Sequence, residues 1–556
     1  MKLKLFTAVA ILLCCGSCIS KDETLGGNMI PVSHTYKVVA PAPLEIPVSM
    51  RASDSLSAYS STRITIGAIR NDDEFGLSTR SSCITLVPMF VDTLDYGTNP
   101  VFKRFHFSVA LDTVSVCDNS QSNILQNVYV YELTKQLDTN YTTYCASTPE
   151  HSEKTVTAGI PIINGTDSLS FDFSKEFAEK YMKILAEDVA DINSYTKKFP
   201  GIYITTNQPH GRGGRFNLYN LQLDYDVDYG YLLGNLAKLR FYSTWKKKDS
   251  DGKFTGETET KDTTFYFYLS ATGIYDIDSL LTNTKTSGNF PQYCANITTE
   301  SSRSLAGKAE DVIYIDGGGG IKPVISARML RDTVRKVIAD NGHDPSRAVI
   351  NKATITMHYM APDEDFELMY KVPEVLSPTV RKKADTLYAF MGLTDSSDSD
   401  EDQGNIHRSR MTYSPDITYH LQSLLSLKDD DESLLNGSYD VWLLIMHNDV
   451  VVTTTSGNTE MSDYYNYLAY SSMMYGSYGG YGGYGGYGYG GYGNPYTNYY
   501  NYAMMAQYYG SSTTSSSTTL NLDRDRYYYC KLHGPGASDA TLRPSFSFTY
   551  SIPNEL

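Results

Sequence analysis

The sequence lacks the short motifs that mark the common enzyme classes. Its 556 residues contain no HExxH zinc motif, no GxSxG nucleophile elbow and no P-loop, and the ten histidines show no paired metal spacing. The glycine-rich stretches 211–215 and 316–320 lack the Lys-Ser/Thr of a phosphate cradle, so we expect tight turns there. The second stretch precedes an expected helix, which leaves weak anion binding at that helix as an alternative. We predict no catalytic residue, no metal site and no cofactor.

Paired cysteines and long apolar runs are also missing. Beyond the first 18 residues the cysteines are scattered, with no CxxC among them: Cys83, Cys117, Cys145, Cys294 and Cys530. Because five is an odd number, at least one thiol is free or pairs between chains, and we expect small buried hydrophobes. No segment after residue 18 has eighteen consecutive apolar residues, so we predict no membrane-spanning helix.

The sequence has fewer positively than negatively charged residues. The 47 lysines and arginines are outnumbered by 63 aspartates and glutamates, which gives a formal net charge of −16 at pH 7. This balance argues against a basic face for DNA, RNA or an anionic lipid surface, so we expect no nucleic-acid partner. The 41% apolar content is enough for one large core or two smaller ones, and the 47 tyrosines favour strands.

Residues 1–17 have the pattern of a lipoprotein signal peptide. Two lysines precede an apolar run over residues 5–13 that is too short to span a bilayer, and small residues lead to Cys18. This arrangement matches the cleavage box of bacterial lipoproteins, so we predict that Cys18 carries the lipid, including palmitate, and becomes the mature N-terminus. Cys15 is the alternative acceptor, and a soluble secreted protein is the alternative to lipidation.

A short charged segment follows the predicted anchor. Lys21, Asp22 and Glu23 resemble the acidic signal that sends lipoproteins of the Bacteroidota phylum to the outer face of the outer membrane. Several acyl chains on one residue would make the anchoring stable. We therefore expect a lipid-anchored protein of the cell outer membrane that faces the exterior, with an ordinary solvated tether as the alternative reading of these charges.

Short apolar or alternating runs bounded by turn residues fill most of the remaining chain, and this pattern is typical of β-sandwiches and jelly rolls. We predict a mainly β protein of antiparallel β-sandwich or jelly-roll-like lobes, with one or two short helices and a long disordered Tyr/Gly loop insertion. The predicted divisions are a lipid-anchored tether and first strand (18–60), a first lobe (61–232), a second lobe (233–455), a Tyr/Gly/Ser low-complexity insertion (456–519) and closing strands of the second lobe (520–556). One large two-sheet domain is the alternative.

Local signals place two helices and a hairpin. Ser174 is a suitable N-cap for a helix over residues 174–189, which carries an apolar stripe at helical spacing. A second helix is expected over residues 325–339. Asp251 and Gly252 form a typical turn pair within a charged stretch, so we predict a β-hairpin there.

Five phrases in a fixed order are similar to those of a known family. They lie at residues 66–86, 127–144, 199–207, 314–325 and 349–359. Together they resemble a Bacteroidota outer-membrane lipoprotein family catalogued as domain of unknown function 4270, over residues 20–455 and the final strand. The resemblance implies the location and the β fold, and it provides no catalytic residues to transfer. The sequence departs from the family pattern at Asn71–Gly76, where Asp-Pro-x-Phe-Gly is usual, and in the Tyr/Gly insertion.

Two surface chemistries remain as hypotheses. Asp-Ser or Asp-Thr followed by an apolar residue or Thr resembles the O-glycosylation sequon of this phylum, and turn-forming pairs are the alternative explanation. The candidate acceptors are Ser55, Thr93, Thr113, Ser168, Thr263, Ser279, Thr333 and Thr386. The acidic triplet 72–74 has charges that suit calcium, as do Asp398, Asp400 and Asp402, but neither stretch has the glycine of an EF-hand, so we expect solvated loops.

Three functions fit these features. The first is a non-enzymatic binding or scaffolding module that docks on an outer-membrane β-barrel or lipoprotein partner for assembly, export or uptake. The second is a carbohydrate-binding or adhesive protein, because jelly rolls bind glycans through aromatic platforms and this chain is rich in tyrosine. A hydrolase is the third. The fold alone does not separate them.

Overall fold

The computed structural model is mainly β and consists of two sandwich-like lobes, and the pairs between its described strands are antiparallel. The described residues are 35–554, apart from 54–55, 61–62, 90–95, 138–147, 187–191, 222, 227–230, 270–293, 362–371, 385–386, 394, 396–403, 454–514 and 523–524. The predicted signal peptide, the anchor and most of the Tyr/Gly insertion therefore lie outside the described residues.

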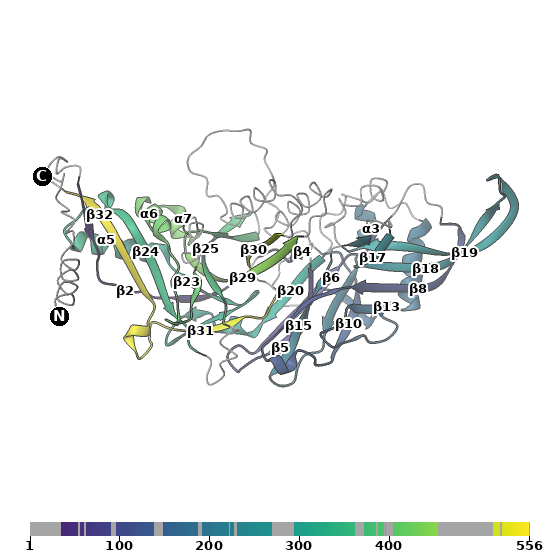
Figure 1. Ribbon diagram of the computed structural model, residues 1–556, viewed down its shortest axis with the longest axis horizontal. Coiled ribbons are helices and arrows are strands. Elements are labelled where there is room, and N and C mark those ends of the chain that lie inside the picture. Colours follow the sequence, from purple (N-terminus) through teal and green to yellow (C-terminus); the bar gives the residue numbers. More distant parts are fainter. Residues whose placement is uncertain are drawn as a thin grey trace, which may run out of the picture.

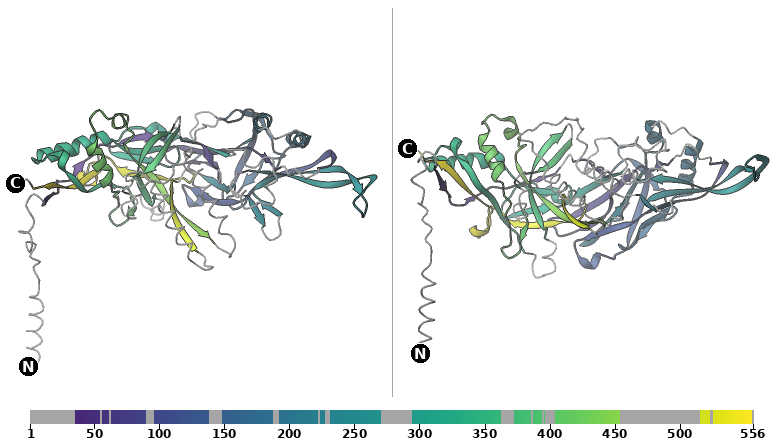
Figure 2. Two further views of the ribbon diagram at one scale, coloured as in Figure 1. Left: turned by 90° about the horizontal axis from the view of Figure 1, so that it is seen from above. Right: turned by 45° about the horizontal axis from the view of Figure 1, so that its top comes forward.

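The two lobes lie side by side along the long axis of the molecule (Figure 1). We call residues 59–300 the inserted lobe, because they interrupt the other lobe in sequence. We call residues 35–52 and 307–554 the terminal lobe. Two further views show the same elongated arrangement of the described elements (Figure 2).

The inserted lobe packs a ten-stranded sheet against a five-stranded sheet. The larger sheet contains β4 (Tyr59–Ser60), β5 (Arg63–Arg70), β6 (Leu77–Ile84), β9 (Leu111–Val116), β10 (Gln126–Leu133), β11 (His151–Thr155), β12 (Ile162–Ile163), β14 (Ile202–Thr206), β15 (Gly213–Asn220) and β20 (Cys294–Glu300). The smaller sheet has the order β13 (Leu169–Asp172), β8 (Thr98–Val109), β18 (Leu236–Lys248), β19 (Phe254–Tyr268) and β7 (Val87–Pro88). A separate pair joins β16 (Asp224–Asp226) and β17 (Tyr231–Gly234).

Strand alternation explains the core of the inserted lobe. Phe105, Leu239 and Phe265 are opposite one another on β8, β18 and β19, and all three are fully buried. The next residues along these strands, Arg104 and Arg240, are exposed. A period of two therefore separates an apolar inner face from a charged outer face.

The terminal lobe is built on the same plan. Its six-stranded sheet contains β1 (Tyr36–Val39), β2 (Leu44–Glu45), β24 (Val349–His358), β27 (Ile406–His407), β28 (Thr412–Tyr413) and β32 (Ser545–Pro553). Its seven-stranded sheet contains β3 (Ser49–Ala52), β21 (Gly307–Lys308), β23 (Ile321–Ile325), β25 (Val375–Ala384), β26 (Leu387–Gly392), β29 (Val441–Thr453) and β30 (Ser515–Leu522). The strands β22 (Val312–Asp316) and β31 (Tyr529–His533) form a separate pair.

Both predicted helices are confirmed. Helix α2 (Lys175–Met182) begins after Ser174, whose Oγ accepts a hydrogen bond from the Phe177 amide at 3.3 Å, and a 3₁₀ turn continues it to Ala186. Helix α5 (Ala327–Asp340) buries Leu330, Val334 and Ile338 in the terminal core. Among the described residues, three further α-helices were not predicted: α3 (Ile192–Lys198), α6 (Thr418–Ser426) and α7 (Glu432–Leu435).

The predicted division at residue 232 does not match the strand pairing. Strands β18 and β19 follow that position, but they pair with β8 and supply the core of the inserted lobe. The predicted tether (18–60) contains three strands of the terminal lobe, β1 to β3, and the predicted insertion (456–519) ends inside β30. The cause is that hydrophobic patterns reveal strands locally, whereas the partner of each strand depends on residues hundreds of positions away.

Candidate functional site

Half of the predicted modification sites, and all of the anchor and export signal, lie outside the described residues. These are Cys18, Lys21, Asp22, Glu23, Ser55, Thr93, Ser279 and Thr386. Their predicted roles remain predictions.

The other four candidate acceptors lie in separate elements. Ser168 is exposed in the turn before β13, and Thr113 is half-buried in β9. Thr263 is half-buried in β19 with its Oγ1 2.9 Å from Ser243 Oγ. Thr333 on α5 contacts Met329 through a 3.8 Å Oγ1–Sδ approach. The structure therefore does not bring these residues together, and Ser168 is the most open of the four.

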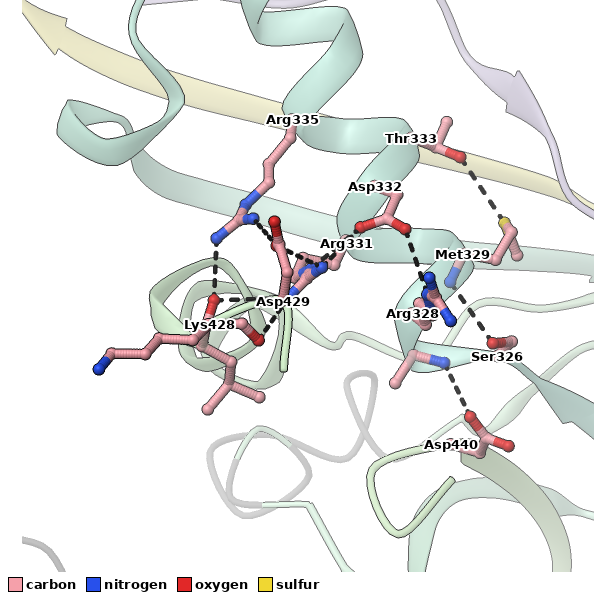
Figure 3. Close-up of polar contacts among 12 residues, drawn as sticks. Ser326, Arg328, Met329, Arg331, Asp332, Thr333, Arg335, Lys428, Asp429 and Asp440 are labelled. Carbon is pink, nitrogen blue, oxygen red and sulfur yellow. Dashed lines mark hydrogen bonds and ion pairs between the residues drawn. The ribbon is translucent and has the colours of Figure 1, made fainter. Parts of the chain in front are cut away.

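Thr333 shares helix α5 with two arginines, Arg331 and Arg335, which join α5 to the end of α6 and which we call the arginine clamp (Figure 3). Arg331 is 2% exposed and donates to Asp429 at 2.8 Å and to the Lys428 carbonyl at 2.9 Å. Arg335 donates to Asp429 at 2.8 Å and to the Leu427 carbonyl at 2.9 Å. The carbonyls at the end of a helix have no partner within it, so these arginines replace the missing hydrogen bonds. This cluster is structural.

The predicted hairpin is confirmed and projects from the far end of the inserted lobe (Figure 1). We call β18, β19 and the turn between them the distal hairpin. The Asp249 carboxylate accepts from the amides of Asp251 and Lys253, and Gly252 adopts a φ of +78°. The turn thus needs both an acceptor at its start and a residue that tolerates the left-handed region.

Aromatic rings with cations over them lie on the surface of the distal hairpin. Tyr242 is 41% exposed and Phe254 is 63% exposed. The ammonium of Lys103 is 4.8 Å from the Tyr242 ring centre, and that of Lys248 is 5.1 Å from the Phe254 ring centre. Exposed aromatics flanked by cations are typical of interaction surfaces.

Ion pairs lie on both faces of this sheet. On the outer face Asp262 bonds to Lys103 and, at 2.5 Å, to Arg240. The hydrogen bond from Lys103 lowers the pKa of the Asp262 carboxyl. On the other face Lys261 contacts Glu259 at 2.6 Å. The surface of the hairpin therefore alternates charges of both signs.

A second polar cluster is buried where the two lobes meet. We call Arg80, Glu300, Ser302, Asp316 and Lys322 the junction cluster. Arg80 Nη1 lies 2.6 Å from Glu300 Oε1, with side chains 1% and 0% exposed. Ser302 donates to Asp316 at 2.5 Å, and Lys322 donates to the Asp316 carbonyl. Pairing and hydrogen bonds make such buried charges tolerable, although Arg80 Nε and Nη2 and Asp316 Oδ1 are buried without a hydrogen-bond partner among the described residues.

The glycines of residues 317–320 form the turn predicted for them and cover the junction cluster. Gly318 has a φ of +55°, and a Cβ there would lie 2.4 Å from Arg80 Nη2. The Gly319 amide donates to Glu300 at 3.3 Å. Strand β23 separates this turn from α5, so the turn is not at a helix N-terminus, and the anion-binding alternative loses its basis.

Burial shifts two ionisations in the junction cluster. Burial, followed by the nearby Glu300 charge, raises the pKa of Asp316 to about 6. Burial lowers the pKa of Lys322 to about 8, because the charged ammonium is desolvated there. Both groups therefore titrate closer to neutrality than they would in water.

The other glycine-rich stretch differs from its prediction. Gly213 and Gly214 begin β15 instead of forming a turn, and a Cβ on Gly214 would lie 2.1 Å from the Ala68 carbonyl oxygen. The glycines are needed because two strands approach closely. The following Arg215 is buried and donates to the carbonyls of Ser122 and Ile124 at 2.7 and 2.8 Å.

Two of the three carboxylates at 72–74 form ion pairs with one lysine. Lys531 Nζ lies 3.0 Å from Asp72 and 3.3 Å from Glu74, and Asp72 also accepts from the Phe75 amide at 2.8 Å. Within the described ranges, no group of three or more His, Cys, Asp or Glu side chains is placed to hold a metal ion.

The described cysteines are buried, as expected for small hydrophobes: Cys83, Cys117, Cys294 and Cys530. Burial raises the pKa of Cys530 to about 12. Cys145 lies outside the described residues. A thiol with so high a pKa is a poor nucleophile at neutral pH.

Sequence reasoning missed the junction cluster. Arg80 and Glu300 are 220 positions apart, and their contact depends on the pairing of β6 with β20. The available signal was the polar character of β6, in which Ser78, Arg80 and Ser82 face the same side of a buried strand. Such a stripe indicates a polar interface between lobes instead of an apolar core.

No helix in the described part of the chain is long and apolar enough to cross a membrane.

Comparisons of the chain with protein-family models, with curated proteins and with solved structures found no match.

Proposed function

We propose that this protein is a surface-exposed, lipid-anchored outer-membrane protein that serves as a non-enzymatic binding or scaffolding module. A suitable role is that of an accessory subunit in an outer-membrane β-barrel complex for assembly, export or uptake. The predicted lipidation of Cys18 and the charged segment after it support the location.

The observation that carries the binding role is the separation between the first strand and the distal hairpin. β1 begins at Tyr36, 18 residues after Cys18, and pairs with β32 at one end of the long axis (Figure 1). The distal hairpin projects from the opposite end. A protein anchored through Cys18 would thus hold an exposed aromatic and charged surface away from its membrane.

The anchor is tested with Cys18→Ala in the native cell. We expect the wild-type protein to incorporate labelled palmitate and the variant to lose the label and leave the membrane fraction. Replacing Lys21, Asp22 and Glu23 by alanine should keep the label but remove access of protease to the protein on intact cells. Labelled Cys18→Ala protein would contradict the anchor, and unchanged protease access would contradict the export signal.

The binding role is tested by purification from outer membranes in mild detergent, with mass spectrometry of what co-purifies. A stoichiometric barrel or lipoprotein partner is expected. The double variant Tyr242→Ser/Phe254→Ser should lose it. Ile160→Ser/Ile162→Ser is the matched control, because these residues are 55% and 60% exposed elsewhere on the same lobe. Equal recovery of the partner with both variants would exclude the hairpin as the docking surface.

The second candidate is carbohydrate binding, which the exposed Tyr242 and Phe254 rings favour because sugars stack on aromatic faces. A glycan panel probed with the wild-type protein and the Tyr242→Ser/Phe254→Ser variant separates the two functions. Wild-type binding that the variant loses supports this candidate, and no binding to any glycan counts against it.

A further inference from the structure

The outer edge of β19 is a long strand edge without a strand partner among the described residues. β19 pairs with β18 on one side, and on the other side β7 and the following Met89 cover only Tyr266–Tyr268. Phe254–Thr264 therefore present their outward backbone groups to solvent within the described part of the chain. Open edges of this kind act as templates for another strand.

The sequence of this edge favours pairing. Residues 254–264 contain five threonines and no proline, and threonine suits a half-exposed strand. Proteins usually protect such edges with proline, with charged side chains and lysine above all, or with β-bulges. This edge has one lysine, Lys261, and its charge is already balanced by Glu259 at 2.6 Å. The protections that remain are the charged side chains of residues 257–262 and the register shift near Lys246–Lys248 at the start of the edge, and charges protect only when like charges meet.

We propose that a second copy of this chain pairs with this edge, β19 against β19 and antiparallel, with Thr260 at the two-fold centre. The argument is charge complementarity along the edge. It is independent of the lipid anchor and of any other partner, because it uses only the described residues of β19.

The two-fold arrangement restricts the register. Antiparallel neighbours in one sheet are related by an axis perpendicular to the sheet, so residues opposite each other point to the same face. With Thr260 at the centre, Glu259 lies opposite Lys261 twice. Thr258 then lies opposite Asp262, and no like charges meet.

The neighbouring registers place like charges opposite each other. A centre at residue 259, 261 or 262 sets Glu259, Lys261 or Asp262 against its own copy. A centre at residue 258 sets Glu257 against Glu259. Like charges directly opposite each other in a sheet are destabilising. Among the five registers centred on residues 258–262, only the one at Thr260 is therefore self-complementary.

Disulfide formation tests the register in the full chain. In a pair centred on Thr260, the two copies of that residue have Cβ atoms about 4.5–5.5 Å apart, close to disulfide distance. The two copies of Thr258 are four residues apart along the strands, about 13 Å, which is too far. We expect Thr260→Cys to form a covalent dimer under mild oxidation and Thr258→Cys to remain at the wild-type background. Equal cross-linking of the two variants, or none in either, would overturn the proposal.

Charge reversal tests the pairing in solution. The dimer dissociation constant from sedimentation equilibrium should rise about ten-fold in Lys261→Glu, because two attractive pairs become two repulsive ones. The swapped variant Glu259→Lys/Lys261→Glu restores opposite charges and should return to the wild-type constant. A wild-type protein that is monomeric at every concentration, or a swapped variant no tighter than Lys261→Glu, would show that β19 does not pair with itself.

Discussion

The Arg80–Glu300 ion pair is held in the interior by more than its own charges. Arg80 Cζ lies 4.6 Å from the centre of the Phe216 ring, and Arg80 Nη1 also donates to the Thr79 carbonyl at 3.0 Å. Glu300 accepts from the Gly319 amide. Each charge therefore has a second contact that replaces part of its lost hydration, which is what a desolvated pair requires.

Removal of one member of the Arg80–Glu300 ion pair should destabilise the protein. We expect Arg80→Met to lower the free energy of unfolding by about 3–5 kcal/mol, because the Glu300 carboxylate would stay buried without its partner. Urea titration measures the change. The double variant Arg80→Met/Glu300→Leu should recover most of the loss, since neither charge remains. A double variant as unstable as the single one would mean that packing, and not charge, holds this position.

Asp316 should make stability depend on pH in a specific direction. Its pKa is raised from 3.8 to about 6, so its contribution is fully present below pH 4 and is lost as pH rises through 6. Compared with Asp316→Asn, the wild-type free energy of unfolding should rise by about 2 kcal/mol between pH 7 and pH 4.

The difference between the two proteins removes the contribution of titrating groups that do not interact with Asp316. Asp395, whose burial also raises its pKa to about 6, contributes equally to both and cancels. Urea titrations at several pH values give the curve. Parallel pH profiles for the two proteins would contradict the assignment.

At the scale of elements, the polyglycine turn is a segment with little tolerance for a side chain. Gly318→Ala should cost at least about 1 kcal/mol, because φ is +55° and the new Cβ would meet Arg80. Gly159→Ala is the control, since a Cβ there meets nothing within 4 Å. Thermal unfolding should show a lower midpoint for the first variant and an unchanged or slightly higher one for the second.

The helices show which elements the sequence could predict. α2 has its own N-cap in Ser174 and an apolar stripe, so the prediction needed only local residues. α6 follows Ile417, which offers no side-chain cap; Asp416 accepts from the Thr418 amide, and Asp395 accepts from the next two amides. Because most of this cap comes from another part of the chain, the local signal is weak and this helix was missed.

The candidate sites also divide into those that local sequence predicts and those that depend on distant strand pairing. The turn of the distal hairpin was predictable because Asp251 and Gly252 stand next to each other in the sequence. The open edge of β19 was not predictable, because it depends on where β7 stops pairing with β19. The junction cluster was not predictable either, since it joins residues from β6, β20, β22 and β23, which are far apart in the sequence.

At the scale of the whole molecule, the inserted lobe should fold by itself. A fragment of residues 56–305 keeps the ten- and five-stranded sheets and should unfold cooperatively in urea. A fragment of residues 56–232 lacks β18, β19 and β20, which contribute Phe241, Phe265 and Phe267 to the core. It would expose Phe105 and should aggregate. Circular dichroism and sedimentation compare the two, and a stable shorter fragment would support the division at residue 232 after all.

The order of the strands in the chain also determines when each strand can pair during synthesis. β3 pairs with β21 through Met50 and Gly307, so the inserted lobe leaves and re-enters the terminal lobe at neighbouring positions. β1 pairs with β32 through Tyr36 and Pro553, which are 517 residues apart. At about 5–20 residues per second of synthesis, roughly half a minute to two minutes pass between the two strands. The inserted lobe can mature during this delay, while β1 to β3 must wait without their final partners. The half-finished terminal lobe is thus the stage at which a nascent molecule is most exposed to chaperones, proteases and aggregation.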